Sequence, residues 1–246
     1  MPRLFEKGSM RSNSSPKVLY PLFPVIPVLF FLLLASCATT GPARGSAPPV
    51  GVQPASGPAK PLSGTQQKLI EGAARLLGED SLTVNGRSFP MDCTGTVLAI
   101  YWYAGIDLEK NLGRYTGNGV TRLYRFMEDK RLLDSPRDPV PGDLIFWDNT
   151  YDANEDGKFN DDLTHVGMVV YVLEEGTVEY VHLNYRRGIV LERMNLRQPV
   201  DRTTKVDRYQ ILINSPVRAR NSPPAPRDAS LAGELCRGLG RAWVLE

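Results

Sequence analysis

THVGMVVYVLEEGTVEYVHLNYRRGIVLERM, residues 164–194, is the stretch that decides the fold. It holds three runs rich in β-branched and aromatic residues, over 166–173, 177–183 and 188–194, and such residues favour strands. Glu175-Gly176 places a tight turn between the first two runs, so these strands fold back on each other. The stretch therefore predicts the antiparallel centre of a sheet.

Helical periodicity dominates the chain before this stretch, and further strand patterns lie on either side of it. The expected helices are 65–78, 93–103 and 119–130, and the further strands are 144–147 and 209–213. Thr65 is placed to cap the first helix. Helices that precede a run of antiparallel strands are typical of the α+β class. We therefore expect an α+β domain in which N-terminal helices pack on an antiparallel sheet of about five strands.

The N-terminus has the organisation of a secretory signal over residues 1–36. A basic segment ends at Lys17, and an apolar run over 18–35 leads to the small residues that precede Cys37. A transmembrane helix is the alternative, but prolines at positions 21, 24 and 27 would break its backbone hydrogen bonds.

The ending Leu34-Ala35-Ser36-Cys37 resembles a bacterial lipobox, which implies that Cys37 is lipidated and anchors the chain to a membrane. By the same resemblance, Ala38 after the cysteine directs an exported lipoprotein to the outer membrane, facing the periplasm. An ordinary signal or a plain anchor remains the alternative.

Composition divides the rest of the chain into three parts. Residues 37–64 are rich in Pro, Gly, Ala and Ser and predict a linker, 65–215 hold the periodic elements, and 216–246 begin as a Pro-rich tail. A short helix over 229–239 is expected in this tail. Without the first 36 residues the formal net charge changes from +2 to −1, and no basic stripe stands out. Nucleic acid is therefore not an expected partner.

Cys93 stands at the predicted start of the helix 93–103. Free backbone N–H groups and the positive end of the helix dipole gather at such a position, which favours the thiolate over the thiol. A thiolate is a nucleophile, and the same N–H groups can hold an oxyanion. The alternatives are a buried structural cysteine and, in an oxidising compartment, a disulfide between Cys93 and Cys236.

The chain has two histidines, His165 and His182, and both fall in the predicted strands. The turn after 166–173 folds the strands so that both imidazoles can lie on one side of a sheet. A cysteine nucleophile, His165 as base and His182 as the group that orients the base would form a catalytic triad. The alternative for His182 is a half-buried strand residue without a chemical role.

Four segments match, in order, the motifs of a known family. They are Asp92-Cys93-Thr94-Gly95, Pro141-Gly142-Asp143-Leu144-Ile145-Phe146, Thr164-His165-Val166-Gly167 and Val181-His182. Over residues 65–215 the chain therefore resembles the NlpC-type cell-wall cysteine peptidases. The resemblance implies a papain-like fold and an enzyme that cleaves peptide stems of peptidoglycan, often between D-glutamate and a diamino acid, without a cofactor.

The resemblance also assigns roles to single residues. Cys93 matches the nucleophile, His165 the base and His182 the third polar residue. Asp92 matches an aspartate that helps to bind substrate. Thr94 replaces the family's usual serine, keeps its hydroxyl, and is also expected to bind substrate. Residues 85–90 lack the tyrosine and glycine pair usual before the nucleophile, which leaves the cleavage specificity open.

Residues 152–160 follow the D-x-N-x-D-G pattern of a calcium-binding loop. The expected ligands are Asp152, Asn154, Asp156, the backbone carbonyl of Lys158, and Asn160. Leu163 stands where such a loop usually has a bidentate glutamate. We expect a structural calcium that braces the loop entering His165, and the alternative is a solvated acidic loop.

The leading functional hypothesis is hydrolysis of peptidoglycan stem peptides through an acyl-thioester at Cys93. An amidase of the related CHAP type, which cuts the sugar–peptide link, would use the same residues, and so would acyl transfer to an amine. A non-catalytic wall-binding lipoprotein is the alternative from another class.

Overall fold

The computed structural model describes residues 61–134, 138–173, 176–219 and 222–245. The predicted signal, Cys37 and residues 37–60 of the predicted linker lie outside these ranges. The described residues belong to one compact unit, Ser56–Glu246. Within the described ranges, no helix is long and apolar enough to cross a membrane.

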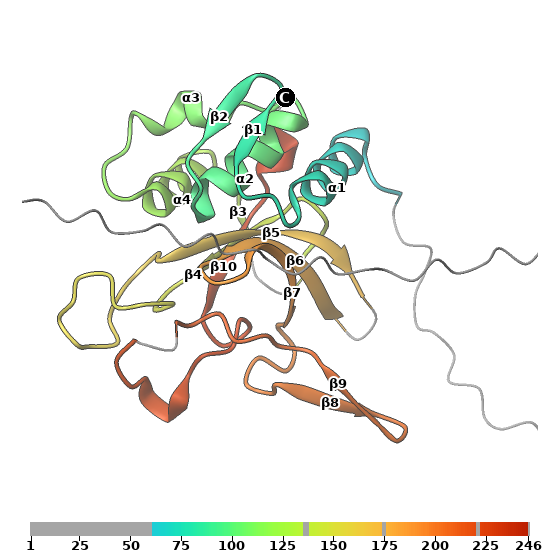
Figure 1. Cartoon of the computed structure of the whole chain (residues 1–246), viewed down its shortest axis with the longest axis vertical. Coiled ribbons are helices and arrows are strands. Elements are labelled where there is room, and N and C mark those ends of the chain that lie inside the picture. Colours follow the sequence, from blue (N-terminus) through green and yellow to red (C-terminus); the bar gives the residue numbers. More distant parts are fainter. Residues whose placement is uncertain (1–60, 135–137, 174–175, 220–221, 246) are drawn as a thin grey trace, which may run out of the picture. The chain divides into compact units, whose positions relative to one another are not determined.

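A six-stranded antiparallel sheet runs through the middle of this unit (Figure 1). Its strands, in spatial order, are β3 (Leu133–Asp134), β10 (Cys236–Gly240), β4 (Leu144–Trp147), β5 (His165–Val172), β6 (Thr177–Asn184) and β7 (Gly188–Asn195). The helices are α1 (Gly64–Leu76), α2 (Cys93–Tyr103), α3 (Glu109–Leu112) and α4 (Gly119–Asp129). The α+β class is confirmed, with six strands in the sheet rather than about five.

Two small hairpins and two single turns of 3-10 helix complete the described elements. They are β1 (Leu82–Val84) with β2 (Arg87–Phe89), β8 (Thr203–Val206) with β9 (Tyr209–Leu212), η2 (Pro226–Asp228) and η3 (Ala242–Val244). The predicted strand 209–213 therefore exists as β9, but it pairs with β8 in a separate ribbon and does not enter the main sheet.

The cap of helix α1 lies two residues before the residue expected to cap it. Ser63, not Thr65, is the N-cap, because its hydroxyl accepts the Gln66 amide at 3.2 Å while the Gln66 side chain accepts the Ser63 amide at 3.0 Å. This reciprocal capping box satisfies two backbone donors at once. The Gln66 side chain also donates to the Pro141 carbonyl at 2.7 Å, which ties α1 to the segment that enters β4.

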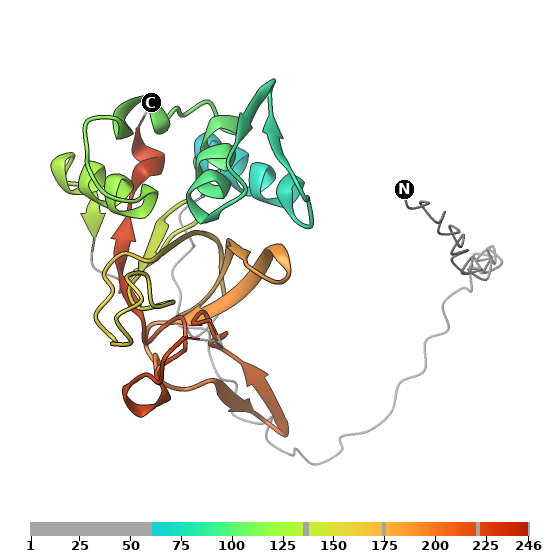
Figure 2. The same ribbon diagram turned by 60° about the vertical axis from the view of Figure 1, so that its left-hand side comes forward.

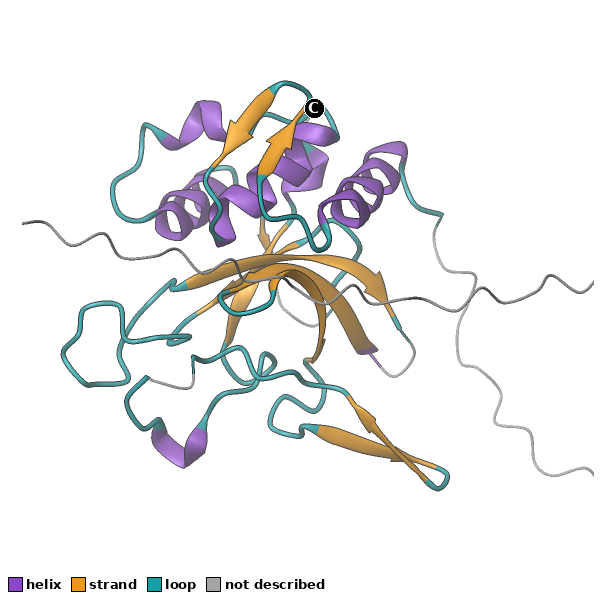
Figure 3. Ribbon diagram, in the orientation of Figure 1, coloured by secondary structure: helices purple, strands orange, loops and turns teal. Residues whose placement is uncertain are grey.

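The sheet is covered on both faces (Figure 3). The helices cover the face formed by Leu144, Phe146, Val166, Met168 and Val181. Irregular C-terminal chain covers the other face, where Ala229, Ala232 and Leu235 pack on Ile145, Trp147, Val169 and Tyr180. Burial on two faces explains why these strands are apolar at nearly every position instead of alternating.

The C-terminal segment departs most from the sequence expectation. Residues 229–239 do not form a helix; the chain instead forms strand β10, drawn in red in Figure 2, which lies between β3 and β4. Leu239 of β10 is opposite Ile145 of β4. A Cβ on Gly240 would lie 3.1 Å from both the Met127 Cγ and the Phe146 Cε2, so glycine lets β10 pass close to α4 and β4. Part of the predicted tail 216–246 is thus inside the main sheet.

We predict that Leu239→Ala lowers the free energy of unfolding by about 2–5 kcal/mol, because it leaves a cavity between β10 and the neighbouring strands. Leu239 is 1% exposed and belongs to the cluster on the C-terminal face. Val244→Ala is the matched control, because Val244 is 46% exposed and its truncation should cost less than about 0.5 kcal/mol. Urea denaturation measures both, and equal values would mean that β10 is peripheral to the fold.

Candidate active site

Asp92 fixes the start of α2 and therefore the place of Cys93. Its side chain accepts the Gly95 amide at 2.7 Å, and its carbonyl accepts the Thr96 amide and hydroxyl. Gly95 has to be glycine, because a Cβ there would lie 1.9 Å from the Pro90 carbonyl oxygen. Asp92 thus has a clear structural role as helix cap, and its expected role in substrate binding stays a prediction.

The Cys93 thiol does not have the lowered pKa that the helix start led us to expect. Burial raises the pKa of this thiol, and the negative charge of Asp92 acts in the same direction. Hydrogen-bond donors from Val166 and Thr94 oppose the rise without overcoming it. The expected stabilisation of the thiolate is therefore wrong for the resting protein, in which Cys93 is a neutral thiol.

The two histidines meet as the sequence predicts. His165 opens β5, His182 lies on β6, and their Nε2 and Nδ1 atoms are 2.8 Å apart. The two rings are nearly perpendicular, with centroids 5.1 Å apart. Burial lowers the pKa of His165 well below its ordinary range. Burial, helped by the positive charge of Arg187, lowers the pKa of His182 to about 3, so both imidazoles are neutral near pH 7.

Cys93, His165 and His182 line one cavity of about 290 Å³. Asp92 and Tyr151 also line it, and residues 216–219 of the C-terminal segment form part of its wall. Among the described contacts, Cys93 and His165 share a cavity without a hydrogen bond between them. Because His165 Nε2 faces His182, Nδ1 is the nitrogen left to approach the thiol.

Thr94 is not among the described residues that line this cavity. Its side chain lies against the start of α4, since a Cβ on Gly119 would be 2.6 Å from the Thr94 hydroxyl oxygen. Cys236 is also away from the cavity. Both Cys93 and Cys236 are free thiols, so the alternative of a disulfide between them is not what the structure contains.

Sequence reasoning missed a buried glutamate behind the histidines. Glu192 on β7 has a side chain only 4% exposed, and its Oε2 lies 3.2 Å from His182 Nε2. The Tyr180 hydroxyl donates to the same oxygen at 3.2 Å, and Arg187 forms an ion pair with Oε1. The sequence did carry a signal, because Glu192 is in phase with Val190 and Met194 along the strand and so shares their face of the sheet.

A groove rich in arginine adjoins the cavity. Its volume is about 540 Å³, and it shares Asn184, Tyr185, Pro216 and Arg218 with the wall of the cavity. Its charged lining comprises Arg186, Arg187, Arg193, Arg202 and Arg218 against Glu179 and Glu192. The two glutamates form ion pairs with Arg193 and Arg187, so the groove retains excess positive charge.

The acidic loop before β5 is folded by its own side chains. Asp152 accepts the Gly157 amide, Asn154 the Asp156 amide and Asp156 the Lys158 amide, at 2.9, 3.0 and 2.9 Å, and the Asn160 amide group donates to Asp156 at 3.2 Å. In the described part of the chain, no three His, Cys, Asp or Glu side chains are grouped as a metal site. A cation here would need amide and carbonyl oxygens as well as carboxylates.

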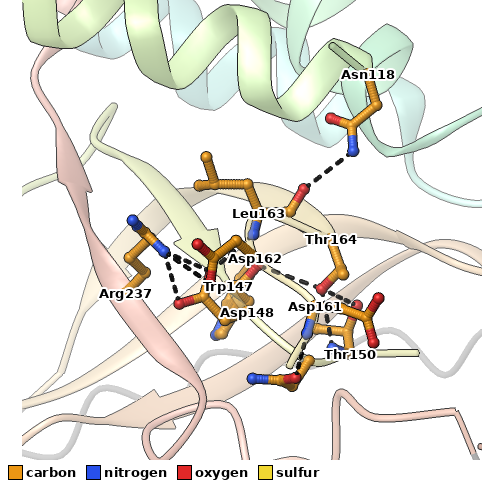
Figure 4. Close-up of polar contacts among 10 residues, drawn as sticks. Asn118, Trp147, Asp148, Thr150, Asp161, Asp162, Leu163, Thr164 and Arg237 are labelled. Carbon is orange, nitrogen blue, oxygen red and sulfur yellow. Dashed lines mark hydrogen bonds and ion pairs between the residues drawn. The ribbon is translucent and has the colours of Figure 1, made fainter. Parts of the chain in front are cut away.

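The two ends of this loop are joined at the base, where β4 ends and β5 begins (Figure 4). Asp148 accepts the Leu163 amide at 2.7 Å, Asn149 accepts the Asp161 amide at 2.8 Å, and the Thr150 hydroxyl and amide each contact the Thr164 hydroxyl at 2.9 Å. These contacts end one residue before His165. The hydrogen bonds that join the two ends of the loop therefore fix the backbone from which His165, the predicted proton acceptor, projects.

No family model and no curated protein matches this chain. The resemblance to NlpC-type peptidases rests on the four ordered motifs, and the geometry of the cavity is an independent observation beside it.

We predict that alkylation of Cys93 by iodoacetamide accelerates from about pH 6 to about pH 9, because only the thiolate reacts and the thiol pKa is raised. Cys236 should stay unmodified over this range, because burial raises its thiol pKa to about 12. Peptide mapping by mass spectrometry measures both sites in one sample. A fast rate at Cys93 that does not change with pH would mean a preformed thiolate–imidazolium pair, contrary to the structure.

Proposed function

We propose that this protein is a cysteine hydrolase that cleaves peptide bonds in the stem peptides of peptidoglycan. The observation that carries the proposal is the convergence of Cys93, His165 and His182 on one cavity, with the imidazoles 2.8 Å apart. The chemistry follows from that geometry, whereas the papain-like fold and the wall substrate follow from the resemblance to NlpC-type peptidases.

The neutral state of the thiol and of both imidazoles defines the first step. His165 takes the Cys93 proton on Nδ1 as Sγ attacks the substrate carbonyl, which makes His165 a general base rather than half of a resting ion pair. The Cys93 amide at the start of α2 has no hydrogen-bond acceptor among the described residues. It is available to the oxyanion of the tetrahedral intermediate.

The remaining steps return the site to its starting state. Collapse of the intermediate breaks the C–N bond, and His165 gives its proton to the leaving amine. The acyl group stays on Cys93 as a thioester. His165 then activates a water that attacks this thioester, and the proton returns to the thiol as the carboxylic acid leaves.

The arginine groove favours an anionic, peptide-like substrate over a neutral one. Stem peptides carry free carboxylates, and guanidinium groups bind carboxylates in two-point contacts. Arg186 and Arg202 line the groove without an ion-pair partner among the described residues. A substrate that reacts at Cys93 and extends past Tyr185 would place its carboxylates beside them.

Other functions could use the same site, and the proposal also includes a place of action in the cell. A CHAP-like amidase reaction or acyl transfer would use the same residues, and a non-catalytic wall-binding protein would use the same groove. The proposed place of action is the periplasmic face of the outer membrane, where lipidated Cys37 would hold the enzyme near its substrate.

We predict that Cys93→Ala lowers the rate of peptidoglycan digestion by about four orders of magnitude or more, because it removes the nucleophile. Cys236→Ala is the matched control and should digest at the wild-type rate, since Cys236 lies outside the cavity. Mass spectrometry of the released fragments separates cleavage within the stem from cleavage at the sugar–peptide link. Equal digestion by wild type and Cys93→Ala, or none by any variant, would refute the proposal.

A further inference from the structure

The proposed mechanism leaves one buried charged group without a role, the carboxylate of Glu192. It lies at the end of a continuous line of contacts that runs from His165 through His182. His182 and Glu192 are 2% and 6% exposed, so water does not compete for these contacts. A carboxylate in such a place would cost free energy unless it had partners, and Arg187 and Tyr180 supply two of them.

We propose that Glu192 is a positioning residue that sets the proton positions on both catalytic imidazoles; this inference rests on the proposed function. An ionised carboxylate only accepts hydrogen bonds, so the nitrogen of His182 that faces it must carry the proton. The facing nitrogen is Nε2, at 3.2 Å from Oε2. This contact does not meet the geometry of a hydrogen bond, and Nε2 has no other hydrogen-bond partner among the described residues. A lone pair on Nε2 would still face the negative charge of the carboxylate at 3.2 Å, so the tautomer with the proton on Nε2 is favoured electrostatically.

The tautomer of His182 then determines that of His165. With its proton on Nε2, His182 has a lone pair on Nδ1 and can only accept there. His165 Nε2, at 2.8 Å, must therefore be the donor. This leaves a lone pair on His165 Nδ1, the nitrogen required to take the Cys93 proton. In the opposite tautomer, His165 Nδ1 would already be protonated and could not act as a base.

The surroundings of Glu192 keep this arrangement neutral overall. Arg187, in the turn between β6 and β7, offsets the charge of the carboxylate, and its side chain is 57% exposed. Tyr180 on β6 donates to the oxygen that faces His182. Trp147 packs beside both imidazoles with ring centroids 5.6 and 6.5 Å away, which keeps the rings from turning freely.

The test compares Glu192→Gln, Glu192→Asp and wild type. Glutamine keeps the shape but can present a donor or an acceptor to His182, so the tautomer preference is lost. We expect kcat for peptidoglycan digestion to fall about 10–100-fold in Glu192→Gln with KM unchanged, and Glu192→Asp to recover part of the loss. Glu109→Gln, on α3 outside the cavity and the groove, is the control and should keep the wild-type kcat.

Nitrogen-15 NMR of the two histidines gives a readout that does not depend on activity. In the resting wild type, His165 should be protonated on Nε2 alone, and in Glu192→Gln a mixture of tautomers should appear. A folded Glu192→Gln protein with unchanged tautomers and unchanged kcat would overturn the inference. Absence of digestion by wild type with the expected tautomers would instead count against the proposed function alone.

A different observation concerns the acidic loop at 152–161. Four buried side-chain nitrogen or oxygen atoms lack a hydrogen-bond partner in the described part of the chain, and two of them are Asp152 Oδ1 and Asp161 Oδ2. The two carboxylates are neighbours, because Asp161 Oδ1 accepts the Ala153 amide at 3.0 Å. Asp161 is 6% exposed, and a buried carboxylate oxygen without a donor is costly.

We infer that this loop binds a calcium ion between Asp152 and Asp161. The other oxygens would come from Asn154, Asp156 and Asn160 side chains and the Lys158 carbonyl, which together suit a hard cation that takes six to eight oxygens. Asp161 replaces the glutamate that Leu163 cannot supply. Each carboxylate already uses one oxygen on the loop backbone and leaves the other one for the ion.

Arg218 is the competing explanation for the two carboxylates. Asp161 and Asp152 both act to raise the pKa of this guanidinium, although burial outweighs them and lowers it. Its nitrogens, however, donate to the Asn149 and Pro223 carbonyls, and its plane packs on Phe159. Arg218 is therefore near the acidic pair without supplying the missing donors.

The experiment adds Ca²⁺ to the metal-free protein and follows binding by calorimetry and the unfolding midpoint against EDTA. We expect one Ca²⁺ per chain in wild type, a raised midpoint, and at least a tenfold weaker affinity in Asp161→Asn. Asp162→Asn is the matched control and should bind as wild type, since Asp162 is 73% exposed and pairs with Arg237. No binding by wild type, or equal weakening in both variants, would overturn the site.

Discussion

The register between β5 and β6 is the constraint on which the candidate site depends. It places Gly167 beside His182, and there is no room for a side chain at this position. A Cβ on Gly167 would lie 2.8 Å from the Val181 carbonyl oxygen and 3.2 Å from the His182 Cβ. Glycine here lets His182 pack beside Trp147, with the ring planes tilted by 53°, and meet His165 from the next strand. A shift of β6 by one residue would move His182 to the helical face, away from His165.

Burial of this histidine pair has a consequence for both chemistry and stability. The pKa of each imidazole is lowered by burial, so a neutral pair faces a neutral thiol in the resting state. In the unfolded chain these rings would take up protons near pH 6.5. Their contribution to stability is therefore complete above about pH 6.5 and declines as the pH falls toward about 3. The neutral imidazole that the proposed general base requires is thus the form that the folded state favours.

The elements that hold the candidate site could be predicted from the sequence, because local signals define them. Helix α2 and strands β4 to β7 lie where periodicity placed them, to within a residue or two. Prediction from the sequence failed where contacts between residues far apart in the chain decide the structure. Strand β10, Cys-Arg-Gly-Leu-Gly, has no alternation of its own and exists because β4 offers it a partner. The pKa of Cys93 likewise depends on burial that no local pattern encodes, and the role of Glu192 depends on the β6–β7 register.

The C-terminal chain links three features that are far apart in sequence. Residues 216–219 form a wall of the cavity, and Arg218 within that wall donates to the Asn149 carbonyl at the base of the acidic loop. The same base fixes the backbone just before His165 (Figure 4). The acidic loop, the cavity wall and the backbone before His165 are therefore connected by hydrogen bonds. Strand β10 follows residues 216–219 in the chain and is paired inside the main sheet. The segment that forms the cavity wall is therefore anchored to the sheet at its C-terminal side.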